Sequence, residues 1–142
     1  MTGLYVVDTN VIVSALITAE PESPPNIILR EMLAGDLRFL MSVDLLAEYR
    51  GVMLRPKIAR YHGLSVDEVD TLLAELAANG TARELGETPS SPDPGDAHLL
   101  ALLACDSRAV LVTGDQALMR KLTPGYRAIT PRECIAALEL DH

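Results

Sequence analysis

Short apolar runs that end at polar residues alternate along this chain with longer amphipathic segments. The run Ala109–Val112 is apolar on both faces, which is typical of a buried strand in a parallel sheet. Parallel strands separated by helices are joined by right-handed crossovers that cover both faces of the sheet. The sequence therefore predicts an α/β fold, a three-layer α/β/α sandwich around a central, mostly parallel sheet. The expected strands are Leu4–Val7, Phe39–Met41, Ala109–Val112 and Tyr126–Ile129, with Ala82–Leu85 as a short edge strand.

A helical hairpin is expected between the second strand and the edge strand. Ser42 is a suitable N-cap for its first helix, and Pro56 should end that helix. Ser65 and Glu68 form a capping-box pattern at the start of the second helix, which Gly80 should end. Other helices are expected over Val11–Leu16, from Pro24 to Gly35, over Asp96–Cys105 and Gln116–Lys121, and from Pro131 onward.

Length and composition restrict the class of protein. The 142 residues suit one domain, 1–142, with a core of its own. No apolar run reaches the ~18 residues of a membrane span, and the first residues lack the pattern of a signal peptide, so we expect a cytoplasmic protein. Cys105 and Cys134 lie in apolar helical patterns and are expected to be reduced core residues. The net charge of −8 argues against a protein that coats nucleic acid nonspecifically.

Four acidic residues, Asp8, Glu48, Asp96 and Asp115, lie in segments that the predicted fold brings together. Asp8 and Asp115 follow buried strands, and Asp96 opens the apolar helix. The carboxyl ends of parallel strands open at one edge of the sheet, where the loops diverge. Carboxylates that converge there repel one another unless a cation is present, and an oxygen-only set of ligands selects Mg²⁺ or Mn²⁺. Such sites mostly serve phosphate chemistry.

Each acidic residue also has a simpler explanation. Asp8 and Asp115 are suitable N-caps for the helices that follow them, and Asp93 with Asp96 suits a helix start that contains a first-turn proline. Glu48 lies in the middle of a helix, where an exposed glutamate is common. These alternatives apply to each residue singly and do not explain why all four are expected at one edge.

The chain resembles the PIN-domain ribonucleases, and in particular the PIN-family toxins of type II toxin-antitoxin systems. The resemblance spans residues 4–121 and lies in four blocks whose order is fairly specific. The blocks are Val7-Asp8-Thr9-Asn10-Val11, then Ser42 with Leu45, Glu48, Val52 and Leu54-Arg55-Pro56-Lys57-Ile58, then Asp93-Pro94-Gly95-Asp96, and finally Val112-Thr113-Gly114-Asp115.

The resemblance implies a Mg²⁺- or Mn²⁺-dependent endoribonuclease that cuts single-stranded or structured RNA by attack of water on a phosphodiester. It implies Asp8 and Asp96 as principal metal ligands, Asp115 as a second or water-mediated ligand, and Glu48 as a ligand or as the residue that orients the attacking water. Asn10 and Thr113 would support them by hydrogen bonds. As alternatives, Asn10 is a suitable helix N-cap, and Thr113 can bond backbone alone.

Cationic residues near these blocks are candidates for holding RNA phosphates. Arg55 and Lys57 follow the first hairpin helix, and Arg120 with Lys121 ends the short helix after Asp115. The alternative is that they are ordinary solvated charges or suit helix C-termini. His62, expected in a loop, and His98, within an apolar helix, are left out of the predicted site because a metal-activated water needs neither.

The resemblance also implies partners. PIN-family toxins pair with a small antitoxin, and an acidic crevice would receive a basic segment of such a partner. A homodimer is expected because the apolar helix positions Val69, Leu73 and Leu76 exceed what a small core can cover.

Two alternatives from other classes stay open. A catalytically silent PIN-like binding module would use the same fold without cutting RNA, although all four acidic positions are intact here. A receiver-like Mg²⁺-binding signalling domain is also an α/β protein with an acidic edge. It needs an aspartate on its middle strand, where this chain has Gly86-Glu87.

Overall fold

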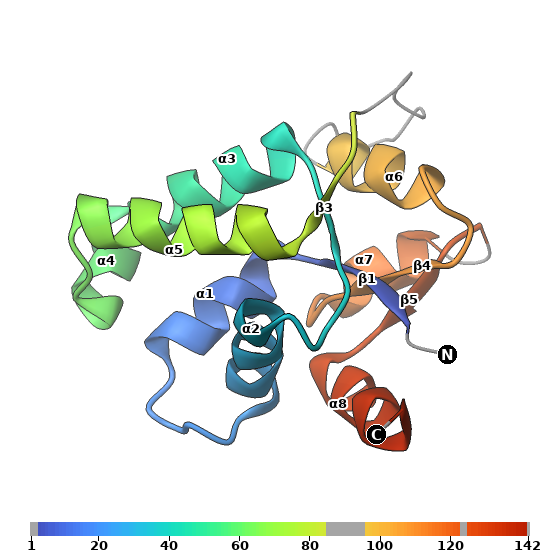
Figure 1. Cartoon of the computed structure of the whole chain (residues 1–142), viewed down its shortest axis with the longest axis horizontal. Helices are drawn as coiled ribbons and strands as arrows, with labels where there is room; N and C mark the ends of the chain where they lie inside the picture. Colours follow the sequence, from blue (N-terminus) through green and yellow to red (C-terminus); the bar gives the residue numbers. More distant parts are fainter. Residues whose placement is uncertain (1–2, 85–95, 123–124, 142) are drawn as a thin grey trace.

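The computed structural model describes residues 3–84, 96–122 and 125–141. A three-stranded parallel sheet with the order β1-β4-β5 lies at its centre (Figure 1). Residues Val7 and Val112 are register partners at the ends of the first two strands. The α/β prediction with a parallel sheet is confirmed. The strands are β1 (Leu4–Val7), β4 (Ala109–Val112) and β5 (Arg127–Ile129).

A second pair of parallel strands extends this sheet beyond β1. Strands β2 (Leu40–Met41) and β3 (Thr81–Ala82) pair with each other. A single parallel bridge joins Tyr5 to Phe39, and the Tyr5 N–H donates to the carbonyl of Arg38 at 3.0 Å. The strands thus follow the order β3-β2-β1-β4-β5. Because the chain winds to one side from β1 and to the other at β4, a crevice is expected at the carboxyl ends of these two strands.

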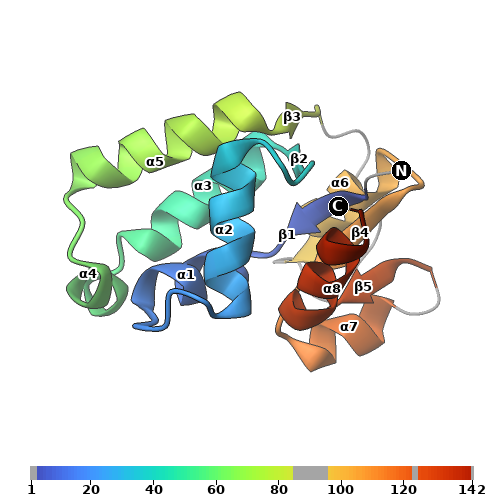
Figure 2. The same ribbon diagram turned by 60° about the horizontal axis from the view of Figure 1, so that its bottom comes forward.

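Helices cover both faces of the sheet. Helix α6 lies on one face and contacts β1 and β4, whereas α8 lies on the other face and contacts α2 (Figure 2). Helices α3 and α5 pack against each other as the predicted hairpin. No helix of the described residues is long and apolar enough to cross a membrane. The helices are α1 (Thr9–Ile17), α2 (Pro24–Ala34), α3 (Val43–Met53), α4 (Pro56–His62), α5 (Val66–Asn79), α6 (Ala97–Ala104), α7 (Gln116–Leu122) and α8 (Pro131–Asp141).

The predicted caps form. The Ser42 hydroxyl accepts the Leu45 N–H at 3.0 Å at the start of α3. Ser65 and Glu68 make both hydrogen bonds of a capping box at the start of α5. These contacts satisfy N–H groups that a helix leaves without partners at its first turn.

Helix α4 is a feature that the sequence interpretation missed. Pro56 ends α3 as predicted, and it also opens α4, because its fixed φ suits the first turn of a helix. His62 therefore ends a helix instead of lying in a loop. Its Nε2 is 2.8 Å from the carbonyl oxygen of Met53, and its Nδ1 accepts the Leu64 N–H. These bonds account for His62 structurally.

The bounds of three strands differ from the prediction. Strand β2 begins at Leu40, one residue after the predicted Phe39, which forms an isolated bridge to Tyr5. The edge strand begins at Thr81, and Arg83 still donates to the Met41 carbonyl at 2.9 Å, whereas Leu85 lies outside the described residues. Strand β5 begins at Arg127 because the N–H of Tyr126 bonds the Leu122 carbonyl at the end of α7.

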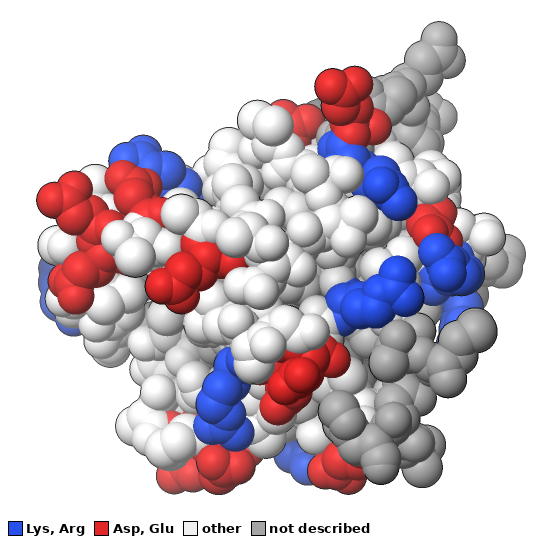
Figure 3. Space-filling model, viewed as in Figure 1, with Lys and Arg blue, Asp and Glu red and all other residues white. Residues whose placement is uncertain are grey.

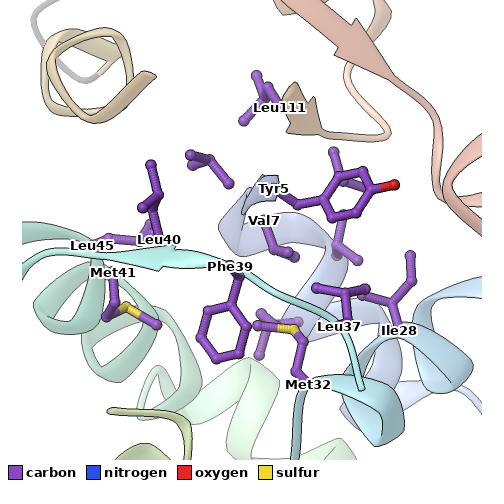
Figure 4. Packing of buried hydrophobic residues seen from close by; sticks show 14 of the residues in the cluster. Tyr5, Val7, Ile28, Met32, Leu37, Phe39, Leu40, Met41, Leu45 and Leu111 are labelled. Atoms are coloured by element: carbon purple, nitrogen blue, oxygen red, sulfur yellow. The ribbon is translucent and has the colours of Figure 1, made fainter. Parts of the chain in front are cut away.

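The core lies between the sheet and the helices around β1 and β2. Figure 4 shows Phe39 and Met32 side by side below the strand, with Val7 and Leu45 nearby. Phe39 and Met32 are each at most 1% exposed. Val69, Leu73 and Leu76 belong to this core and are at most 5% exposed, so the argument that they form an uncovered dimer face was wrong. The homodimer stays a prediction without that support.

The two cysteines differ. Cys134 is buried, and burial raises the pKa of its thiol to about 12. Cys105 is exposed at the end of α6, so the expectation of a core position was wrong for it. The apolar pattern of α6 ends one residue earlier, at Ala104. Neither cysteine lies in a disulfide.

Candidate active site

Asp8 is a buried carboxylate at the junction of β1 and α1, only 8% exposed. Its Oδ1 accepts the backbone N–H of Thr9 at 2.8 Å. Its Oδ2 accepts the hydroxyl of Thr113 at 2.8 Å and the side-chain amide of Asn10 at 3.0 Å. Asp8 is the N-cap of α1, so the capping alternative is correct for it. Two of the three hydrogen bonds to its carboxylate, however, come from the side chains of Asn10 and Thr113.

The parallel register brings Thr113 to Asp8. The ladder continues one step past the strands, since the Asp8 N–H donates to the Val112 carbonyl at 2.9 Å. Thr113 follows Val112 directly and is fully buried. Its hydroxyl bonds a side chain, so the alternative that Thr113 serves the backbone alone was wrong.

Asn10 connects the two strand ends. Its amide group also donates to the Thr113 hydroxyl oxygen at 3.3 Å, and its Oδ1 accepts the Gly114 N–H at 3.3 Å. Asn10 is the second residue of α1 and not its N-cap, so that alternative was wrong. It therefore links the residues after β1 to those after β4.

Glu48 reaches the same place from the middle of α3. Its Oε2 accepts the Thr9 hydroxyl at 2.5 Å and lies 3.5 Å from Nε2 of His98. The Glu48 side chain is 35% exposed. The next residue, Tyr49, is fully buried and donates its hydroxyl to the carbonyl of Val7, which anchors α3 on the end of β1. Glu48 is thus not a plain surface glutamate.

Asp96 stands at the start of α6. It is the N-cap residue by position, and its carboxylate makes no capping hydrogen bond to α6. Its Oδ2 lies 3.9 Å from Nζ of Lys121. Asp93, the other residue of the capping alternative, lies outside the described residues.

Asp115 behaves differently from the other three acids. It is exposed, and its Oδ1 accepts the Leu118 N–H at 3.1 Å, so the capping alternative is correct for it. Its backbone N–H donates to the Thr113 hydroxyl oxygen at 3.0 Å. Among the described residues, Thr113 therefore links Asp115 to Asp8.

The surroundings of Asp8 disfavour its charge. Burial raises its pKa above the ordinary value, the bonds from Thr113 and Thr9 lower it, and the charges of Glu48 and Asp96 raise it further. The net direction is upward. Three acids that fold together against their mutual repulsion are typical of a functional site.

A divalent cation fits this site chemically. The side chains around Asp8 offer carboxylate oxygens, which hard cations prefer, and a cation would offset the repulsion that raises the pKa of Asp8. Among residues 3–84, 96–122 and 125–141, no group of three or more His, Cys, Asp or Glu side chains is arranged to hold a metal ion. The assignment of metal ligands stays a prediction.

The predicted RNA-binding cations fall into two places. Lys121 lies beside Asp96, and Arg120 precedes it in the last turn of α7. Arg55 and Lys57 are exposed at the start of α4, which lies at the opposite end of the molecule from α6 (Figures 1 and 2). Figure 3 shows a face where the charged groups surround a largely uncharged centre, so this face is no basic surface of the kind that coats nucleic acid.

Three residues of this site were missed or set aside in the sequence interpretation: Thr9, Tyr49 and His98. Thr9 belongs to the block around Asp8, and Tyr49 follows Glu48, so each was adjacent to a predicted residue. His98 was left out because it lies in an apolar helix and because a metal-activated water needs no histidine. The sequence carries no local signal for contacts such as that between Thr9 and Glu48, because the two residues are 39 positions apart.

Comparisons with known proteins agree with this geometry. The family model of the PIN domain matches residues 5–117, well over half of the chain, and includes Asp8, Glu48, Asp96 and Asp115. A search of curated proteins finds no match. PIN domains are generally nucleases that use divalent metal ions, and the receiver-like alternative is left without support. The match and the fold together place this chain in the PIN domain family.

Proposed function

We propose that the protein is a metal-dependent endoribonuclease that cuts RNA by attack of water on a phosphodiester. The observation that carries this proposal is Asp8, a carboxylate held by three hydrogen bonds, whose pKa is raised mainly by burial and further by the charges of Glu48 and Asp96. Burial and like charges make ionised Asp8 costly in the metal-free protein, and such a cost is typical of a functional site.

The proposed roles are those that the resemblance to PIN-domain ribonucleases implies. Asp8 and Asp96 would hold the cation as principal ligands, with Asp115 as a second or water-mediated ligand. Glu48 would be a ligand or would orient the attacking water. When bound, a divalent cation supplies charge that stabilises the transition state at phosphorus and makes water more acidic. Thr113 and Asn10 hold Asp8 in one orientation.

RNA is the proposed substrate, held by its phosphates. Lys121 and Arg120 lie on the helix next to the acidic site and suit this role better than Arg55 and Lys57, which lie on the distant α4. Aromatic residues make up only 4% of the chain, so stacking of bases on aromatic rings contributes little.

The test is cleavage of a labelled pool of single-stranded RNA and of DNA with the same sequences, in Mg²⁺, Mn²⁺ or EDTA. We expect RNA to be cut with either metal and to stay intact in EDTA. Cleavage of DNA in place of RNA would correct the substrate, and cleavage in EDTA would contradict the role of the metal.

We also propose that the protein is the toxin of a toxin-antitoxin pair. The acidic cluster and the net charge of −8 suit a small partner with a basic segment that enters the site. Expression should arrest growth, and co-expression of a small protein encoded next to it should restore growth. Unimpaired growth with folded, RNA-cutting protein would count against a toxin.

A binding module without catalysis is the second candidate. It is favoured by Lys121, whose ammonium group already lies near Asp96, and by the absence of a ready set of three ligands in the described ranges. RNA binding without cleavage under any metal would support this alternative.

A further inference from the structure

Thr9 contacts both carboxylates at the centre of the site with different atoms. Its backbone N–H donates to Oδ1 of Asp8 at 2.8 Å, and its side-chain hydroxyl donates to Oε2 of Glu48 at 2.5 Å. It is the first residue of α1 and is 7% exposed. One buried residue thus ties together two acids that come from different elements.

The bond to Glu48 is more than a helix cap. A threonine that only capped α1 would accept an N–H of its own helix, whereas this hydroxyl donates to α3 across 39 positions of sequence.

The remaining oxygen of Glu48 is also informative. Both contacts of its carboxylate, from Thr9 and from His98 at 3.5 Å, are on Oε2. Oε1 makes no hydrogen bond to any residue within the described ranges. The two contacts orient the carboxylate and leave one oxygen for other partners.

We propose that Thr9 is a positioning residue, which fixes the carboxylate of Glu48 relative to that of Asp8 so that both serve one cation. The proposal rests on the proposed function, because it concerns the same site. Groups that orient metal-binding side chains typically change metal affinity or activity by 10–100-fold when removed. Thr9 touches neither RNA nor the reacting atoms in this role.

The test compares Thr9→Val, which keeps the shape but removes the hydroxyl, with Thr9→Ser, which retains it. Mn²⁺ affinity is measured by titration calorimetry on the full chain, and RNA cleavage is measured under saturating metal. We expect Thr9→Val to bind Mn²⁺ about 10-fold or more weakly and to lose turnover with an unchanged KM for RNA. Thr9→Ser should restore most of both.

Control variants keep the outcomes apart. Thr71→Val removes an exposed threonine hydroxyl that donates to the Asp67 carbonyl within α5, and it should match the wild type. Urea unfolding in EDTA measures the free energy of unfolding of the metal-free protein. The losses caused by Thr9→Val and by Glu48→Gln should not add in the double variant, because the two residues share one hydrogen bond.

Two results would overturn the role of Thr9. One is Thr9→Val with wild-type Mn²⁺ affinity and turnover, which would leave a structural role alone. The other is full additivity with Glu48→Gln. The proposed function itself fails differently, since wild-type protein would then neither bind Mn²⁺ nor cut RNA, and Asp8→Asn would change nothing.

Discussion

The hydroxyl of Thr113 donates a hydrogen bond of 2.8 Å to Oδ2 of Asp8, although the two residues are 105 positions apart in the sequence. The same hydroxyl oxygen accepts the backbone N–H of Asp115 at 3.0 Å. One buried side chain therefore connects the end of β1 with the segment that follows β4. The orientation of the Asp8 carboxylate depends on this connection.

Thr113→Val should lower RNA cleavage by roughly 10–100-fold, because Asp8 loses a donor that orients it. Thr113→Ser keeps the hydroxyl and should retain most of the activity. Steady-state cleavage rates of the two variants check this. Equal rates in Thr113→Val and the wild type would show that the bond has no role in the reaction.

Tyr49→Phe should destabilise the fold by about 1–3 kcal/mol, since it leaves the buried carbonyl of Val7 without its donor. Burial, together with the charges of Asp8 and Glu48, raises the pKa of the Tyr49 hydroxyl, so that it stays a donor at neutral pH. Urea unfolding measures the loss. Tyr61→Phe is the matched control, because Tyr61 is 68% exposed, and it should change stability by less than about 0.5 kcal/mol.

Gly80→Ala and Gly51→Ala should shift stability in opposite directions. A Cβ at Gly80 would lie 2.6 Å from Cε2 of the buried Phe39, so the ring must move, at a cost of about 1–3 kcal/mol. A Cβ at Gly51 meets no atom within 4 Å, and alanine there should stabilise α3 by up to about 1 kcal/mol. Thermal unfolding of both variants and the wild type measures these changes in stability. A harmless Gly80→Ala would mean that the core around Phe39 is more plastic than its packing indicates.

The raised pKa of Asp8 predicts a dependence of stability on pH. The folded state holds the Asp8 proton more tightly than the unfolded state does, so the free energy of unfolding falls as pH rises from 3.8 through the raised pKa. At pH 7 the ionised carboxylate therefore destabilises the metal-free fold. Asp8→Asn should be more stable than the wild type at pH 7, and the difference should shrink at pH 3.

Urea unfolding in EDTA at the two pH values measures this difference. Asp44→Asn, which neutralises an exposed acid in the first turn of α3, controls for the change in net charge. The opposite result would be an Asp8→Asn variant that is less stable than the wild type at pH 7, with a smaller loss at pH 3. It would mean that the hydrogen bonds of ionised Asp8 outweigh the cost of burying its charge.

Buried, regular features were predictable from the sequence. The bounds of β1 and β4 agree with the prediction because both strands are apolar along their whole length, and their parallel pairing then brings Asp8 to Thr113. Caps such as Ser42 were predictable because they depend on neighbours three residues away.

Features that depend on contacts distant in sequence were not predictable. The bond from Thr9 to Glu48 leaves no local pattern, and the burial of Val69 and Leu73 depends on which elements pack over α5. Helix α4 was missed because Pro56 was taken only as the end of a helix, although proline suits a first turn equally well. Asp115, in contrast, makes the local capping contact that its position in the sequence indicated.

The central claim is that Asp8 is the centre of a metal-dependent ribonuclease site. The most direct test is the single-turnover rate of RNA cleavage in Mn²⁺ for the wild type, Asp8→Asn and the charge-matched control Asp44→Asn. We predict cleavage by the wild type and Asp44→Asn, its loss on addition of EDTA, and a fall of at least about 100-fold in Asp8→Asn. Cleavage by folded Asp8→Asn at the wild-type rate would contradict the claim.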